Sequence, residues 1–210
     1  MKSSSDGGLT HLDAARYLLP HRMTPRRRLV ALTAAVTGLA LLAAACSNTT
    51  GLPAAVFTNV VDTVSLYALR GTAVALPSAY SIQDRVSVRT DTTVSLDFAF
   101  DFNAAGKPAL LPTEALHLGR LSGLQTTSTT FAAIGLAPTG GYNLDSAVTF
   151  DTGTVFYAVS RPVGCLIGTV PLYAKLHVLN VDTTARRVDF EILVDQNCGY
   201  RGLAPGLPTQ

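Results

Sequence analysis

The chain has 210 residues, a formal net charge of +2 and no tryptophan, and only 14% of its residues are charged. This composition excludes the charge-rich, hydrophobe-poor pattern of disordered proteins. Six of its sixteen Lys and Arg residues precede Cys46, against two acidic residues, so the chain from Cys46 onward carries a net charge of −2. The composition therefore gives no electrostatic support for nucleic-acid binding.

A targeting pattern lies near the start of the chain. The basic run Arg26 to Arg28 precedes the seventeen uncharged residues 29–45, which end in Ala44 and Ala45 and are followed by Cys46. A basic region, an apolar region and small residues at a cleavage point are the parts of a secretory signal peptide. The sequence therefore predicts export, with a helical signal segment ahead of the folded domain.

The cysteine at the cleavage point makes this segment resemble a bacterial lipoprotein signal. Ala44, Ala45 and Cys46 match the lipobox, whereas Ala43 stands where Leu is usual. The resemblance implies that the Cys46 thiol receives diacylglycerol and that the new amino terminus is acylated, for example with palmitate. A secreted protein without lipid and an uncleaved signal anchor are the alternatives, although seventeen residues is short beside the about 20 of a spanning helix.

Three parts of the chain follow from this interpretation. Residues 1–45 are the leader and signal peptide, with Met23 as an alternative start. Residues 46–55 are the lipidated cysteine and a flexible tether rich in small and polar residues. Residues 56–210 are a single domain, which is long enough to bury a core.

Two cysteines remain after Cys46. Cys165 and Cys198 form an even pair, which predicts a disulfide in an oxidising compartment. Two buried free thiols or a metal pair are the alternatives. His117 and His177 lack ligand-like spacing to either cysteine, so we expect neither a metal nor a cofactor.

Alternation of apolar and polar residues with period two predicts an all-β domain. The clearest case is 94–102, in which Asp97 and Asp101 lie on the face expected to be solvated. Strands are predicted at 60–69, 72–76, 82–89, 94–102, 108–111, 129–134, 147–150, 154–159, 169–180 and 187–195. The range 114–121 fits either a strand or one helical turn. Pro108 and Pro112 favour an edge position for the strand predicted at 108–111.

The ranges 169–180 and 187–195 form a predicted hairpin in which Val181 pairs with Arg186. Cys165 and Cys198 then meet at its open end if a bulge near Pro171 absorbs a slip in register. His177 shares the outward register of Tyr173 and Lys175, so we expect it to be exposed. The fold class is a single antiparallel β-sandwich of immunoglobulin-like character, or a small barrel; the cysteine spacing and the missing Trp depart from true immunoglobulin domains.

One stretch suggests an enzyme. Asp151-Thr152-Gly153 and the strand before it resemble the active-site motif of aspartic proteases, which use two such carboxylates. The chain has one copy, and Asp-Thr-Gly is also ordinary hairpin-turn chemistry. A lipid-anchored hydrolase is therefore the second hypothesis.

The first hypothesis is an envelope lipoprotein whose β domain is structural or binds without catalysis. Its partners would be the membrane through the lipid and another envelope protein, a glycan or a small ligand. Ser47 follows the lipid cysteine, where enteric bacteria use Asp for inner-membrane retention. This favours the outer membrane, facing the periplasm or the cell surface.

Overall fold

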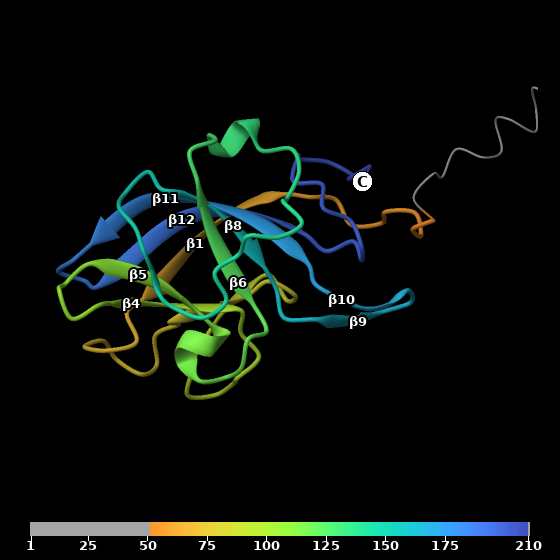
Figure 1. Cartoon of the computed structure of the whole chain (residues 1–210). Helices are drawn as coiled ribbons and strands as arrows, with labels where there is room; N and C mark the ends of the chain where they lie inside the picture. Colours follow the sequence, from red (N-terminus) through yellow and green to blue (C-terminus); the bar gives the residue numbers. More distant parts are fainter. Residues whose placement is uncertain (1–50, 210) are drawn as a thin grey trace, which may run out of the picture. The chain divides into compact units, whose positions relative to one another are not determined.

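The structure, a computed structural model, describes residues 51–209. These residues form two antiparallel five-stranded sheets and a separate two-stranded hairpin (Figure 1). The first sheet has the order β1-β12-β11-β8-β6 and the second β3-β2-β4-β5-β7, while β9 pairs with β10. The strands are β1 Val61–Tyr67, β2 Ala79–Ser81, β3 Val86–Val88, β4 Phe98–Phe102, β5 Pro108–Pro112, β6 Gly123–Thr127, β7 Val148–Thr149, β8 Val155–Val159, β9 Val163–Cys165, β10 Gly168–Val170, β11 Tyr173–Asp182 and β12 Arg187–Asp195, and the 3-10 helices are η1 Thr113–Leu116 and η2 Phe131–Ala133.

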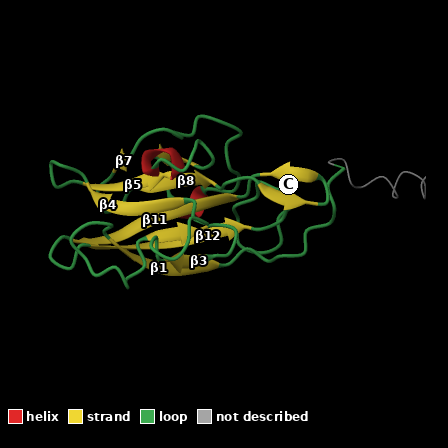
Figure 2. Cartoon of the chain, turned by 90° about the horizontal axis from the view of Figure 1, so that it is seen from below, coloured by secondary structure: helices red, strands yellow, loops and turns green. Residues whose placement is uncertain are grey.

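The two sheets pack face to face on an aromatic core. Figure 2 looks onto the sheets, so that strands of the two overlap, with β5 drawn beside β8 and β3 beside β1. Tyr80 and Phe98 of the second sheet stack with ring centroids 5.6 Å apart, and Phe190 of β12 lies 6.1 Å from Phe98. All three side chains are almost fully buried. The predicted all-β sandwich is therefore confirmed.

The strand predicted at 94–102 is shorter and more buried than its alternation indicates. β4 begins at Phe98, and both of its faces are buried. Its outer face is covered by a small cluster that includes Leu116 and Leu118, from the segment around η1. The prediction that Asp97 and Asp101 lie on a solvated face is therefore wrong, because both are buried.

The turn after β4 agrees with the sequence, but the position of β5 does not. Asn103 Oδ1 accepts hydrogen bonds from the backbone N–H groups of Ala105 and Lys107, which closes the predicted turn. β5 is not an edge strand, since β7 pairs with it. That pairing involves only Ala109 and Leu110, so the prolines at the ends of β5 lie outside this ladder.

The long hairpin is confirmed, with a small change of register. β11 and β12 pair antiparallel from Tyr173 with Asp195 to Asp182 with Arg187. The bulge lies between Val178 and Asn180 rather than near Pro171. The predicted pairing of Val181 with Arg186 is therefore displaced, and Val181 pairs with Val188.

Two predicted strands are absent from the described residues. The range 72–76 lies in a turn region, where Val74 is exposed, and 129–134 contains η2 instead of a strand. In the ambiguous range 114–121 the structure has the end of η1. β6, by contrast, lies in a Thr-rich stretch whose alternation is too weak to predict it.

The loop that carries η2 covers the outer face of the first sheet. Phe131 and Ile134 of this loop form a second apolar cluster with Val155, Leu193 and Leu203. This cover explains why the outward-facing residues of β11 are not all exposed. His177 is partly buried and lies 2.8 Å from Glu191 Oε1.

Lys175 is fully enclosed by this cover. Its Nζ donates hydrogen bonds to the backbone oxygens of Phe131 and Ile134, at 2.8 and 2.9 Å, and lies 4.4 Å from the centroid of the Phe131 ring. Burial lowers the pKa of Lys175 from its ordinary value, because desolvation penalises the ammonium.

The pKa shift predicts how Lys175 affects stability as the pH changes. Between its lowered folded pKa and the ordinary value of 10.5, the unfolded chain binds more protons than the folded one, so stability rises with pH. The advantage of the wild type over Lys175→Met, measured by urea unfolding, should therefore grow as the pH is raised towards 10.5. Lys107→Met removes an exposed lysine and is the control. A Lys175→Met difference with no more pH dependence than the control would contradict the expectation.

Candidate functional site

The candidate site is the end of the sandwich where three distant segments meet. They are residues 51–57, the β9–β10 hairpin and residues 196–200 after β12. Figure 1 shows the start of the described chain and the β9–β10 hairpin on the same side of the domain. Tyr200 and Asn197 hold the first segment, and a disulfide holds the second.

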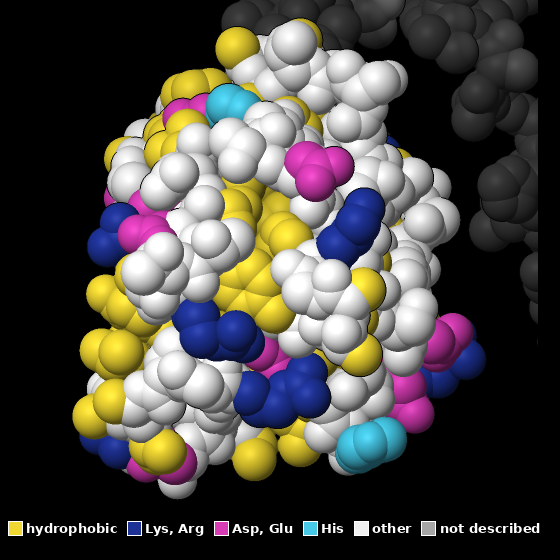
Figure 3. Space-filling view, turned by 90° about the vertical axis from the view of Figure 1, so that its left-hand side faces the viewer, with side chains coloured by type: hydrophobic (Ala, Val, Ile, Leu, Met, Phe, Trp, Pro, Cys, Tyr) yellow, Lys and Arg dark blue, Asp and Glu magenta, His cyan; other side chains and the backbone are white. Residues whose placement is uncertain are grey.

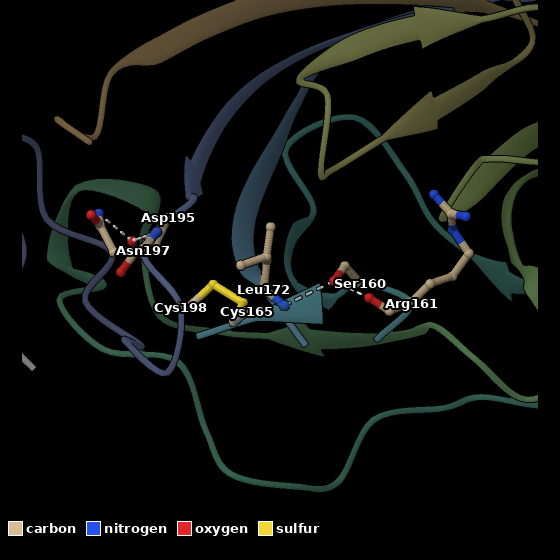
Figure 4. The surroundings of a disulfide bond; sticks show 7 residues. All are labelled: Ser160, Arg161, Cys165, Leu172, Asp195, Asn197 and Cys198. Atoms are coloured by element: carbon tan, nitrogen blue, oxygen red, sulfur yellow. Dashed lines mark hydrogen bonds between the residues drawn. A yellow bond between two sulfur atoms is a disulfide. The ribbon is translucent and has the colours of Figure 1, made fainter. Parts of the chain in front are cut away.

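The disulfide joins Cys165 of β9 to Cys198, with their Cα atoms 6.2 Å apart (Figure 4). The predicted pairing of these cysteines is confirmed. Its setting differs from the prediction, since Cys165 lies in a separate short hairpin rather than on the β11–β12 ribbon. The bond thus fixes a projecting hairpin to the C-terminal segment.

Asn197 holds the N-terminal segment against the same place. Its Oδ1 accepts hydrogen bonds from the backbone N–H groups of Val56 and Phe57, at 2.8 and 2.9 Å. Its Nδ2 donates to Phe57 O at 2.8 Å and to Asp195 Oδ1 at 2.9 Å. The buried side chain of Asn197 therefore joins the N-terminal segment of the domain to the segment that follows β12.

Asp195 and Tyr200 complete this junction. Asp195 Oδ1 also accepts a hydrogen bond from the backbone N–H of Asn197, and burial raises the pKa of the Asp195 carboxyl. The Tyr200 hydroxyl donates to Pro53 O at 2.9 Å. The part of the predicted tether at Pro53 is therefore in contact with the domain.

The base of the hairpin is fixed by a chain of hydrogen bonds. Ser160 Oγ accepts from Leu172 N at 2.8 Å and donates to Arg161 O at 2.6 Å (Figure 4). The backbone N–H of Arg161 donates to Asp97 Oδ1 at 2.6 Å, and Ile82 N donates to Asp97 Oδ2 at 2.6 Å. Burial raises the pKa of Asp97, although these donors oppose the shift. The hairpin therefore leaves the sandwich from a rigid base.

The surface of this end is apolar. A pocket of about 160 Å³ lies between the N-terminal segment and the hairpin, and Phe57, Ile167 and Tyr200 are among its lining residues. Leu166, at the hairpin tip, is 99% exposed, and Val56 is 76% exposed. We call Val56, Phe57, Leu166 and Ile167 the apolar tip.

The other predicted residues do not join this site. Cys46 lies outside the described residues. Asp151 is exposed in the turn between β7 and β8, where its backbone N–H donates to Thr154 Oγ1 and Gly153 adopts a φ of +89°. His117 caps η1. In residues 51–209, no group of three or more His, Cys, Asp or Glu residues could hold a metal ion.

Within the same range, no helix combines the length and hydrophobicity needed to cross a bilayer. Scans of the chain against known protein families and against curated protein sequences find no match.

The disulfide predicts a large contribution to stability. It closes a loop with a sequence separation of 33, so the double variant Cys165→Ser/Cys198→Ser should lose about 3–4 kcal/mol of unfolding free energy through the larger entropy of its unfolded chain. Urea unfolding of the variant and the wild type measures this difference. A loss below about 1 kcal/mol would contradict it.

The Asn197 junction predicts a local effect. In Asn197→Ala, the Val56 and Phe57 amides lose their acceptor, so hydrogen exchange at these two amides should accelerate about tenfold or more. Gln196→Ala is the matched control, because Gln196 Nε2 donates to Gln83 O and no side-chain hydrogen bond of Gln196 holds the amides of Val56 and Phe57, which donate to Asn197. Equal protection in the two variants would show that Asn197 does not hold this segment.

Proposed function

We propose that the chain is the precursor of a bacterial envelope lipoprotein, with residues 1–45 as its signal and Cys46 as its lipid-bearing residue. The observation that carries the proposal is the order of basic residues, uncharged run and Ala44-Ala45-Cys46. The mature chain is held at a membrane by its acyl chains, and its β domain lies outside the cytoplasm.

The cysteine pairing supports export. Disulfides persist in oxidising compartments and are rare in the cytosol, where thiols are kept reduced. The chain has three cysteines, and two of them are bonded to each other. The third is Cys46, at the position where lipid attachment requires a thiol.

In this proposal the domain acts by binding or by a structural role rather than by catalysis. Its partners are the membrane and a second envelope component: a protein, a glycan or a small ligand. The exposed turn around Asp151 fits the turn interpretation of Asp151-Thr152-Gly153. Ser47 after the lipid cysteine favours the outer membrane.

Mass spectrometry and membrane fractionation test the proposal. The native product should lack residues 1–45 and carry the added mass of diacylglycerol and one acyl chain, and it should sediment with membranes. Cys46→Ser should lose both the added mass and the sedimentation, because the thiol is the attachment point. Ser47→Ala, one residue along, is the control and should keep both. An intact leader, or an unmodified Cys46 in the native product, would overturn the proposal.

A further inference from the structure

We propose that the apolar tip contacts the bilayer that anchors the chain, so that Leu166 and Ile167 lie at the boundary between headgroups and acyl chains. This inference rests on the proposed lipid anchor at Cys46. It goes further in giving the domain a defined membrane-facing end. The partner that contacts the apolar tip is a lipid surface.

The residues of the turn are the first observation. Cys165 pairs with Gly168, so Leu166 and Ile167 form a two-residue hairpin loop. The positive φ of this turn lies at Gly168, at +113°, so the two loop positions need no special backbone angle. Their side chains are nevertheless large and apolar, and Leu166 is 99% exposed while Ile167 is 40% exposed. They suit an apolar surface outside the protein.

The reach of the chain identifies that surface. Cys46 lies five residues before Gly51, so its Cα is at most about 18 Å from that of Gly51 even when the chain is fully extended. Leu52 and Ile167 both lie beside Gly199, where an added Cβ would be 2.6 Å from Leu52 Cδ2 and 2.9 Å from Ile167 Cδ1. A lipid on Cys46 is thus restricted to the neighbourhood of the hairpin.

The distribution of charge agrees with this orientation. Residues 51–61, 162–174 and 196–200 contain no charged residue, so these three segments can approach hydrocarbon without desolvating a charge of their own. Charged residues lie beside them at the turn after β2, where Gln83 O accepts a hydrogen bond from Gln196 and Arg85 pairs with Asp62. At the opposite end, Arg70 and Arg186 both pair with Asp101. Figure 3 views that end and shows Lys and Arg side chains beside acidic ones around a strip of hydrophobic side chains.

The fixed geometry of the hairpin is the last step. The Ser160–Leu172 hydrogen bond holds its base, and the Cys165–Cys198 bond holds it directly beside the two-residue loop. The tip therefore cannot fold back onto the sandwich to hide its leucine. An amphipathic element at a membrane buries its apolar face about 5–10 Å into the interface, a depth that a side chain at the end of such a hairpin can reach.

A single tryptophan tests this contact, because the chain has none of its own. Leu166→Trp is made in the full-length chain, and the lipid-modified product is reconstituted into phosphatidylcholine vesicles with or without bromine on the acyl chains. We expect its emission to shift to shorter wavelength and to fall about two-fold or more with brominated lipid, since the indole lies within the interface. Val74→Trp is the matched control: Val74 is 69% exposed in the loop after β1, at the other end of the domain. Its emission should be unaffected by bromine.

The outcomes separate this inference from the proposed function. If mass spectrometry finds the lipid on Cys46 but bromine quenches Leu166→Trp no more than Val74→Trp, the inference fails and the lipoprotein proposal stands. A wavelength shift without quenching by bromine means that a protein covers the tip, such as a second copy of this chain, and also overturns the inference. Absence of the lipid overturns both proposals. Ile167→Trp provides a second probe if Leu166→Trp folds poorly.

Discussion

The bond between Cys165 and Cys198 is the constraint on which the uncharged end of the domain depends. Segments at the end of a β-sandwich usually move independently, because few contacts join them. Here the disulfide fixes the β9–β10 hairpin to the C-terminal segment, and Asn197, the residue before Cys198, holds the N-terminal segment. Two adjacent residues therefore convert three loose segments into one rigid surface, and that rigidity allows a two-residue loop to remain fully exposed.

The sequence predicted the parts of the fold in which one face of a strand is solvated. β12 has the predicted bounds, since its alternation of apolar and charged residues reflects one buried and one more open face. The same reasoning failed at β4, where Leu116 and Leu118 cover the outer face and Asp97 and Asp101 are buried. A period of two identifies a strand, but it cannot reveal that a distant segment covers the polar face.

The candidate site was predictable only where the sequence carries a chemical label. The cysteines have one, and their pairing followed from the even pair that remains after Cys46. Asn197 has none: its partners Val56 and Phe57 are 141 and 140 residues away. Lys175 shares this property, since the carbonyl oxygens that receive its hydrogen bonds belong to η2 and the residue after it, on the loop that covers the sheet. Such contacts depend on the packing of the whole domain, which local patterns do not encode.

The uncharged end also bears on what a lipid anchor can do. One acyl chain gives only marginal membrane binding, whereas several chains hold a protein firmly. In the proposed lipoprotein the acylated Cys46 supplies the affinity, so the apolar tip is not needed for attachment. A single point of attachment does not fix the orientation of a domain, however, whereas a second contact close to that point restricts it. If the apolar tip meets the bilayer as we propose, the charged face formed by Arg70, Arg186 and Asp101, at the opposite end of the strands, is turned away from it and is open to a soluble or envelope partner.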